Sequence, residues 1–383
     1  MKNMIDKIEY KPEWQQLATF VLNKTTPVHN WFYYKEGFSK ELVDILIKDF
    51  GIKQGHTVLD PFCGSGTTLL ACKQNNINAI GLDVLPISVF ASKVKTCDYD
   101  IEKLSQVKQD FMKIRFEKPI PIQMESVKFM KLYFSRYALE DIVFLRRAIA
   151  GIEDEDIRNL FTLALINTAL KISYIWKDGA VLKVRKHPTP PMRKLFKRIL
   201  EIMIKSLKKT NSTQTTVMVK QHDARYIPLE DESVDCVITS PPYYNNIDYT
   251  KIYKIENWFV NDIMENEPSV RSFVSGVDYY FEDMKKVLCE LFRVCKKGAK
   301  LALVVGNGFL KNHLIFQRSP FEEHSGLHDG KVVESDILLS EIAEKIGFVV
   351  EKIITVNERF ALKDRTTKVG KLRESIIILS KPL

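Results

Sequence analysis

The feature that most constrains this chain is a glycine-rich turn between a short apolar run and a segment of helical composition. Thr57-Val58-Leu59 is apolar and largely β-branched, the next residues read Asp60-Pro61-Phe62-Cys63-Gly64-Ser65-Gly66, and Thr67 to Cys72 favours a helix. Gly64 and Gly66 can adopt positive φ angles, and the helix N-terminus leaves amide N–H groups facing the turn. The segment therefore predicts a strand, a tight turn and a helix that together hold an anionic group.

Polar residues follow other apolar runs of the chain. Each of these is a predicted strand with polar residues at its carboxyl end: Asn78 to Asp83, Val217 to Asp223, and Val234 to Ser240. In an open α/β sheet ligands bind beyond these ends, so the residues are expected to gather around one site. Asp83 follows the turn by about twenty residues, the separation of an acid that accepts hydrogen bonds from a ribose.

Alternatives exist for each of these features on its own. A dinucleotide site would favour a third glycine, where this chain has Leu69. Asp83 or Asp223 alone is typical of a helix cap or a solvated loop. A Pro-Pro pair is ordinarily a rigid turn. Their ordered combination at strand ends favours a single cofactor site.

Together, Asp60 to Thr68 and Ser240-Pro241-Pro242-Tyr243 resemble the motifs of the amino-group DNA methyltransferases, which form N4-methylcytosine or N6-methyladenine. The resemblance implies a doubly wound α/β sheet of the Rossmann-like class I methyltransferase type, with S-adenosyl-L-methionine as cofactor. It covers the two ends of the chain well and the middle only loosely. The cofactor contacts that it implies come from the segment His29 to Leu42, the turn and the strand ends: Phe38, Asp60, Phe62, Gly64, Gly66, Thr67, Thr68, Asp83, Asp223 and Ala224.

The tetrapeptide has the composition that methyl transfer to an exocyclic amine requires. The amine shares its lone pair with the base, so acceptors must hold both its hydrogens while it attacks the sulfonium methyl. We expect the Ser240 hydroxyl and the Pro241 carbonyl to be these acceptors. Pro241 and Pro242 stiffen the backbone, and the Tyr243 ring stacks on a flipped-out base, without any metal. By resemblance, serine in the first position favours cytosine N4, with adenine N6 as the alternative.

Composition fits an enzyme that acts on a polyanion. The chain has 383 residues, 45% of them hydrophobic, and a formal net charge of +9. No apolar run reaches the length of a membrane span, the N-terminus does not resemble a signal peptide, and the six cysteines show no disulfide or C-x-x-C spacing. We therefore expect a cytoplasmic protein with reduced thiols, in which Cys63 is a small buried side chain.

A long insertion separates the two groups of motifs. We expect residues 1–97 to form the cofactor half of the methyltransferase domain, 98–215 a helical, partly basic insertion, and 216–383 the catalytic half. Met124 to Ile175 has apolar residues at helical spacing. We expect the basic stretch that follows to contact DNA phosphates, with a solvated helix face as the alternative: Lys183, Arg185, Lys186, Arg193, Lys194, Lys197 and Arg198.

The target-recognition region has three candidate segments. In this family it generally follows the third strand when it lies between the two motifs, whereas this insertion precedes the strand at Val217. The candidates are the insertion, residues 246–276 and residues 306–334. A second basic group is expected in the connection between the last two strands, where it meets phosphate: Arg359, Lys363, Arg365, Lys368, Lys371 and Arg373.

The expected function is site-specific methylation of double-stranded DNA within a restriction-modification system whose endonuclease acts separately. An RNA base methyltransferase would use the same chemistry on a single-stranded base, and the basic insertion is compatible with it. A catalytically inactive nucleic-acid-binding protein is the third hypothesis. The intact residues of the turn and the tetrapeptide disfavour it.

Overall fold

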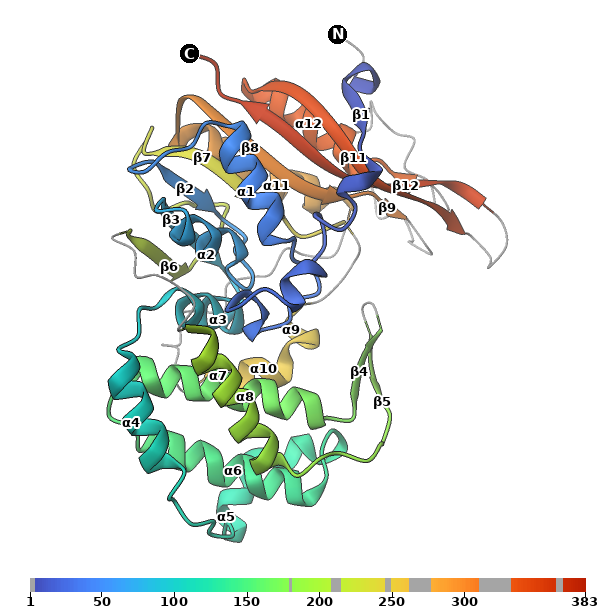
Figure 1. Cartoon of the computed structure of the whole chain (residues 1–383). Coiled ribbons are helices and arrows are strands. Elements are labelled where there is room, and N and C mark those ends of the chain that lie inside the picture. The colour runs from blue at the N-terminus through green and yellow to red at the C-terminus, as the bar shows by residue number, and fades with distance from the viewer. Residues whose placement is uncertain are drawn as a thin grey trace.

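The computed structural model describes residues 4–178, 181–207, 215–244, 249–261, 277–309, 332–362 and 368–383. One layer is an eight-stranded sheet (Figure 1) with the strands β1 (Ile8–Tyr10), β2 (Thr57–Asp60), β3 (Asn78–Asp83), β6 (Val217–Gln221), β7 (Val234–Thr239), β8 (Cys295–Gly306), β11 (Val349–Leu362) and β12 (Lys368–Ser380). Their order is β1-β11-β12-β8-β7-β2-β3-β6. All neighbours are parallel except β12, which is antiparallel to β11 and β8. The predicted doubly wound α/β sheet is confirmed.

The chain reverses its direction across the sheet between β2 and β7. From β2 the sheet continues to β3 and β6 on one side, and from β7 to β8 and β12 on the other. The glycine-rich turn follows β2 and the tetrapeptide follows β7. Both motifs therefore lie at the topological switch point, where open α/β sheets bind their ligands.

Helices cover both faces of the sheet because successive strand residues point to opposite sides. These helices are α1 (Lys40–Asp49), α2 (Thr67–Gln74), α3 (Pro86–Thr96), α11 (Val277–Val294) and α12 (Ser335–Ile346). Val58 packs in a core with Leu42 of α1 and Leu69 of α2. The next residue, Leu59, packs in a separate core with Leu288 of α11 and Leu339 of α12. This alternation fixes the register of the strands.

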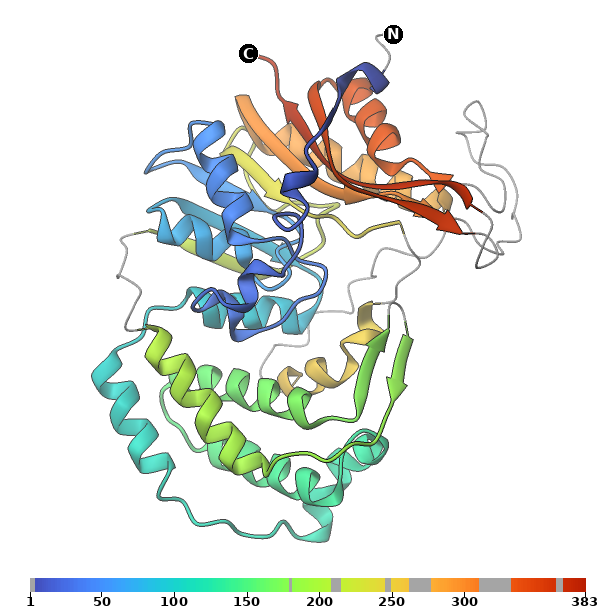
Figure 2. The ribbon, with the colours of Figure 1, turned by 45° about the vertical axis from the view of Figure 1, so that its right-hand side comes forward.

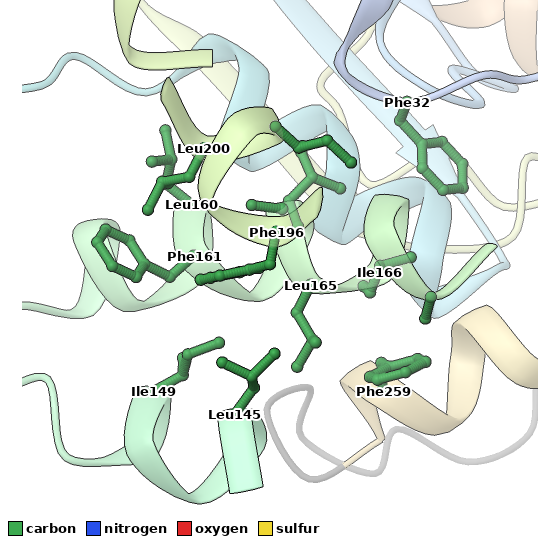
Figure 3. Packing of buried hydrophobic residues seen from close by; sticks show 14 of the residues in the cluster. Phe32, Leu145, Ile149, Leu160, Phe161, Leu165, Ile166, Phe196, Leu200 and Phe259 are labelled. Carbon is green, nitrogen blue, oxygen red and sulfur yellow. The ribbon is translucent and has the colours of Figure 1, made fainter. Parts of the chain in front are cut away.

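A helical subdomain forms the second body of the molecule (Figure 2). It contains α4 (Ile101–Phe111), α5 (Pro121–Met124), α6 (Arg136–Ala150), α7 (Glu155–Ile172), α8 (Met192–Leu207), α9 (Tyr249–Ile252) and α10 (Lys254–Val260). α9 and α10 follow the tetrapeptide in sequence but share this core, as Phe259 shows beside residues of α6, α7 and α8 (Figure 3). The segment after the catalytic motif thus joins the insertion in one hydrophobic unit.

The two longest helices of the subdomain differ in how they are covered. α7 has apolar residues around most of its circumference, and Phe161, Leu163 and Leu165 are all at most 1% exposed. α8 buries one face through Phe196 and Leu200 and leaves its charged face in solvent. A helix that is apolar all round belongs in the centre, and a one-sided helix belongs at the surface.

Short elements complete the described chain. They are the 3₁₀ helices η1 (Met4–Lys7), η2 (Pro12–Trp14), η3 (Leu22–Lys24), η4 (His29–Trp31) and η5 (Glu125–Leu132) and the strand pairs β4 (Ile175–Asp178) with β5 (Val181–Val184) and β9 (Gly308–Phe309) with β10 (Val332–Val333). None of the described helices is long and apolar enough to cross a membrane.

Two features differ from the sequence-based expectations. The β4–β5 hairpin was not among the expected elements, although Asp178-Gly179 between two apolar, β-branched runs is a hairpin signal. The prediction that a second basic group lies in the connection between the last two strands was also wrong. Arg359 lies within β11, and Lys368, Lys371 and Arg373 lie within β12, because these strands pair far beyond their apolar segments. Lys363 and Arg365 lie outside the described residues.

Candidate active site

The glycine-rich turn needs both of its glycines, for conformation and for space. Gly64 has a φ of +50° and Gly66 a φ of +77°, and Gly66 is the N-cap of α2. A Cβ on Gly64 would lie 2.9 Å from a ring carbon of Tyr34, and one on Gly66 would lie 2.8 Å from Ser92 Oγ. Only glycine fits such a backbone without strain. The turn is thus enclosed by Tyr34 on one side and by α3 on the other.

Asp83 stands at the carboxyl end of β3 and holds the turn in place. Its Oδ2 accepts a hydrogen bond from the Gly64 amide at 2.9 Å, and its Oδ1 accepts one from the Leu85 amide at 2.8 Å. Burial raises the pKa of Asp83 to about 6, and these amide bonds oppose the rise. The Val84 amide and the Ser88 hydroxyl also interact with this carboxylate. Because an ionised carboxylate accepts several hydrogen bonds, a ligand hydroxyl can join or replace these donors.

Asp60 joins the two sequence motifs directly. Its Oδ1 accepts the Thr239 hydroxyl at 2.6 Å and the Phe62 amide at 3.2 Å. Thr68 makes a second link, since its hydroxyl donates to the Ile238 carbonyl at 3.2 Å. Burial raises the pKa of Asp60 to about 6, against the hydrogen bond from Thr239. The cofactor turn and the tetrapeptide therefore hold one another in register.

The tetrapeptide presents two acceptors at the end of β7. The Ser240 hydroxyl donates to the Val304 carbonyl of β8 at 3.0 Å, so its oxygen lone pairs remain acceptors for another group. Among the described residues, none donates a hydrogen bond to the Pro241 carbonyl. The prolines fix φ and bring no backbone donor into this segment. Two oxygen acceptors are thus available side by side in the chain.

Tyr243 lies against the end of β8. A Cβ on Gly306 would be 2.7 Å from two carbons of the Tyr243 ring, so glycine allows the ring to lie on the backbone there. The Tyr243 hydroxyl donates to Glu374 Oε1 of β12 at 3.1 Å. Burial and the neighbouring Glu374 hold the pKa of Tyr243 well above its usual value, so the phenol stays protonated. The ring is held from three strands, β7, β8 and β12.

Asp223, at the carboxyl end of β6, has a different environment from Asp83. Both oxygens of Asp223 contact the guanidinium of Arg225, with the shortest distance 2.5 Å, and Arg225 also pairs with Asp283 of α11 at 2.8 Å. The neighbouring Ala224 is buried. The backbone of this segment reaches the site, since the His222 amide donates to the Asp83 carbonyl at 3.0 Å.

The remaining predicted cofactor residues support the turn. Phe38 is buried in the core beside α1, and its carbonyl accepts Asn23 Nδ2 at 2.9 Å. The same Asn23 nitrogen lies 3.3 Å from the Thr67 hydroxyl oxygen. Phe62 is partly buried against the other face of the sheet. Asn23 therefore connects the N-terminal segment to the first residue of α2, and no short motif around it would have identified this role.

Two further residues beside the turn were missed in the sequence. Lys95 of α3 is 2% exposed and donates to the Ser65 carbonyl at 2.9 Å, and burial lowers its pKa to about 7. Tyr34 lies against Gly64 and stacks on Tyr253, the N-cap residue of α10, with ring centroids 5.3 Å apart and planes 14° apart. A lysine at an otherwise apolar helix position is the one signal that could have marked Lys95. Cys63 of the turn is buried, as predicted.

The structure divides the basic stretch of the insertion between two elements. Lys183 lies on β5, Arg185 and Lys186 follow it, and all three are exposed. Lys194, Lys197 and Arg198 are exposed on α8. Arg193, by contrast, pairs with Asp141 of α6 at 3.0 Å and covers the Phe116 ring at 4.3 Å. The candidate recognition segments 246–276 and 306–334 lie largely outside the described residues.

Comparison with known proteins shows which family has both motifs. A family model described as a DNA methylase of the N6/N4 methyltransferases matches residues 5–87 and 234–382, which contain both motifs and omit the insertion. The type II methyltransferase M.BsoBI of Geobacillus stearothermophilus is 28% identical over 470 residues, covering 96% of this chain and 88% of that protein. The type II methyltransferase M.AvaI of Nostoc sp. is 26% identical over 423 residues, covering 89% and 83%.

Proposed function

This chain belongs to the N6/N4 DNA methylase family and is an S-adenosyl-L-methionine-dependent DNA methyltransferase; we propose that it methylates the N4 amine of cytosine at a specific site in double-stranded DNA. The observation that carries the proposal is the Ser240 hydroxyl. When its proton is donated to the Val304 carbonyl, the lone pairs of its oxygen can accept a hydrogen from a substrate. An acceptor is what an exocyclic amine needs.

The geometry supports amine methylation through positioning. The Ser240 oxygen and the Pro241 carbonyl accept the two amine hydrogens and turn the nitrogen lone pair toward the methyl donor. Tyr243, held by Gly306 and Glu374, offers its ring to the extruded base. By resemblance, serine in place of an acid or amide at the first position supports cytosine over adenine.

The residues around the turn fit the cofactor. S-adenosyl-L-methionine supplies the activated methyl group when it is bound. We assign its carboxylate to the amides at the N-terminus of α2, where the helix dipole favours an anion. Asp83 accepts the ribose hydroxyls, and Asp223 with Ala224 borders the adenine.

A role in a restriction-modification system follows from the relatives. M.BsoBI and M.AvaI are named as type II methyltransferases, and this chain aligns with most of each. We propose a separate endonuclease that cleaves the same site when it is unmethylated, with both enzymes acting on DNA in the cytoplasm.

Methyl incorporation into duplex DNA, tRNA and rRNA tests the substrate class. The purified protein is given labelled cofactor and each nucleic acid at equal base concentration. Incorporation into duplex DNA alone is expected. Labelling of tRNA or rRNA in preference to DNA would make it an RNA methyltransferase. Cofactor binding without transfer to any of the three would make it a binding protein.

A further inference from the structure

The β4–β5 hairpin has two faces with opposite surroundings. The pairing places Trp176 opposite Lys183 and Lys177 opposite Leu182. Leu182 and Ile175 pack against the core of the helical subdomain, whereas Trp176 is 63% exposed. A tryptophan that is largely in solvent offers a flat aromatic surface and an N–H group to a partner. The hairpin is therefore built to present one aromatic face to the outside.

The packed face fixes the hairpin beside the cofactor turn. Lys177 Nζ lies 2.5 Å from Glu256 Oε1 of α10, which is 1% exposed, and 3.9 Å from the centre of the Tyr253 ring. Tyr253 stacks on Tyr34, and Tyr34 lies against Gly64. In both ribbon views the hairpin rises from the subdomain, beside α9, toward β9 and the end of β12 (Figures 1 and 2). Trp176 is thus held on the catalytic side of the molecule.

Basic residues extend this face along the chain. Lys183, Arg185 and Lys186 are all exposed. The backbone that carries them is held to the subdomain, since the Arg185 amide donates to the Tyr174 carbonyl at 2.8 Å and the His187 ring lies 3.1 Å from the Ser173 carbonyl. Ordered positive charge beside an exposed aromatic ring matches the surface of nucleic acid.

We propose that the β4–β5 hairpin enters a groove of the DNA duplex next to the target base, with Trp176 against the bases and Arg185 and Lys186 on the phosphates. The major groove, about 12 Å wide, admits a two-stranded β-ribbon. Because Lys177 ties the same hairpin to Tyr253, DNA held by the hairpin stands in a fixed relation to the cofactor turn. The proposal rests on duplex DNA being the substrate and names the element that reads it.

The first test compares Trp176→Ala with Tyr137→Ala. Tyr137 is the matched control because it is 80% exposed on α6, outside the hairpin. Affinity for a duplex that carries the target sequence is measured by fluorescence anisotropy, and cofactor affinity is measured by calorimetry. We expect Trp176→Ala to weaken duplex binding about tenfold, as loss of an aromatic contact with a base does, with cofactor affinity unchanged. Tyr137→Ala should match the wild type. Equal duplex affinity in all three proteins would overturn the proposal.

A second measurement uses the tryptophan as its own reporter. The chain has four tryptophans, and we expect addition of duplex to quench emission in the wild type but much less in Trp176→Phe. Double replacement of Arg185 and Lys186 by Gln should lower the slope of log affinity against log salt by about 0.9 per lost contact. Equal quenching in the wild type and Trp176→Phe, or an unchanged slope, would remove the hairpin from the interface. If the wild type itself neither binds nor methylates duplex DNA, the proposed function fails instead.

Discussion

The sheet-end site and the helical subdomain use their charged residues in different ways. At the sheet end, the carboxylates of Asp83 and Asp60 are held by backbone amides and by a hydroxyl of the neighbouring motif. In the subdomain, Arg193 and Lys177 are held by carboxylates and rings from distant helices. Asp83 and Asp60 thus have their positions set mainly by hydrogen bonds within the two motifs, whereas Arg193 and Lys177 have theirs set by the packing of the subdomain. Substitutions in the two regions should therefore differ in what they change.

Ser240→Ala should have the largest effect on the reaction. Loss of one preorganised hydrogen-bonding group at a reacting centre costs about 100-fold or more in rate. Cofactor affinity should stay within about twofold, because the Ser240 hydroxyl bonds to β8 and not to the turn. Single-turnover transfer of labelled methyl measures the rate, and calorimetry the affinity. Wild-type turnover in the variant would show that the tetrapeptide is only a rigid turn.

Tyr243→Ala should have the next largest effect and a different signature. Stacking on an aromatic ring contributes about 1–3 kcal/mol per base, so extrusion of the target base should suffer. A mismatch that weakens the target pair should partly restore transfer by this variant. The same mismatch should help Ser240→Ala little. A fluorescent base analogue at the target position reports extrusion, and equal rescue of both variants would contradict the division of roles.

Asp83→Ala should weaken cofactor binding by about 1.5–3 kcal/mol, the strength of hydrogen bonds to a charged group. The pH dependence of cofactor affinity gives a sharper test. Burial raises the pKa of Asp83 to about 6, so protonation below that pH removes the acceptor, and wild-type affinity should fall as pH drops through about 6. Asp83→Asn should lose this pH dependence, apart from any step due to Asp60. Calorimetry from pH 5 to pH 8 measures both, and an unchanged dissociation constant in folded Asp83→Ala would remove Asp83 from the site.

The smallest effect at a fixed salt concentration is expected on the exposed face of α8. Replacing Lys194, Lys197 and Arg198 by Gln should lower duplex affinity equally for all sequences and reduce the salt slope by about 0.9 per lost contact. Arg193→Gln is the control within the same helix. Because Arg193 is paired with Asp141, this change should lower the melting temperature and leave the slope nearly unaltered. If the triple variant has the wild-type slope of log affinity against log salt, this face of α8 is only a solvated surface that does not contact DNA.

Much of the sheet was predictable because its strands and turns carry local signals. The glycine-rich turn, Asp83 and the tetrapeptide each follow a short apolar run, and the parallel order brings their ends together. The β4–β5 hairpin and the length of β11 and β12 were not predictable from apolar periodicity. Charged residues interrupt the apolar runs of these strands, as Lys177 and Lys183 do in the hairpin and Arg359 and Lys371 do in β11 and β12. The apolar pattern therefore does not mark their full extent.

The supporting residues of the site could not be read from the sequence for a related reason. Asn23, Tyr34, Lys95 and Glu374 reach the two motifs from three different segments of the chain. No spacing rule links an asparagine in the N-terminal segment to a threonine that begins α2. Such contacts exist only once the layers are packed, so the sequence identifies the reacting groups more readily than the residues that hold them.

The most direct test of the account is the identity of the methylated nucleoside. DNA from cells that express the wild-type chain, and from cells that express Ser240→Ala, is digested to nucleosides and separated with mass detection, and the modified bases are then located by sequencing. We predict N4-methylcytosine at one short recurring sequence in the wild-type sample and its loss in the variant. N6-methyladenine in place of N4-methylcytosine would contradict the assignment of the target base to cytosine. Equal modification in both samples would contradict the catalytic role proposed for Ser240.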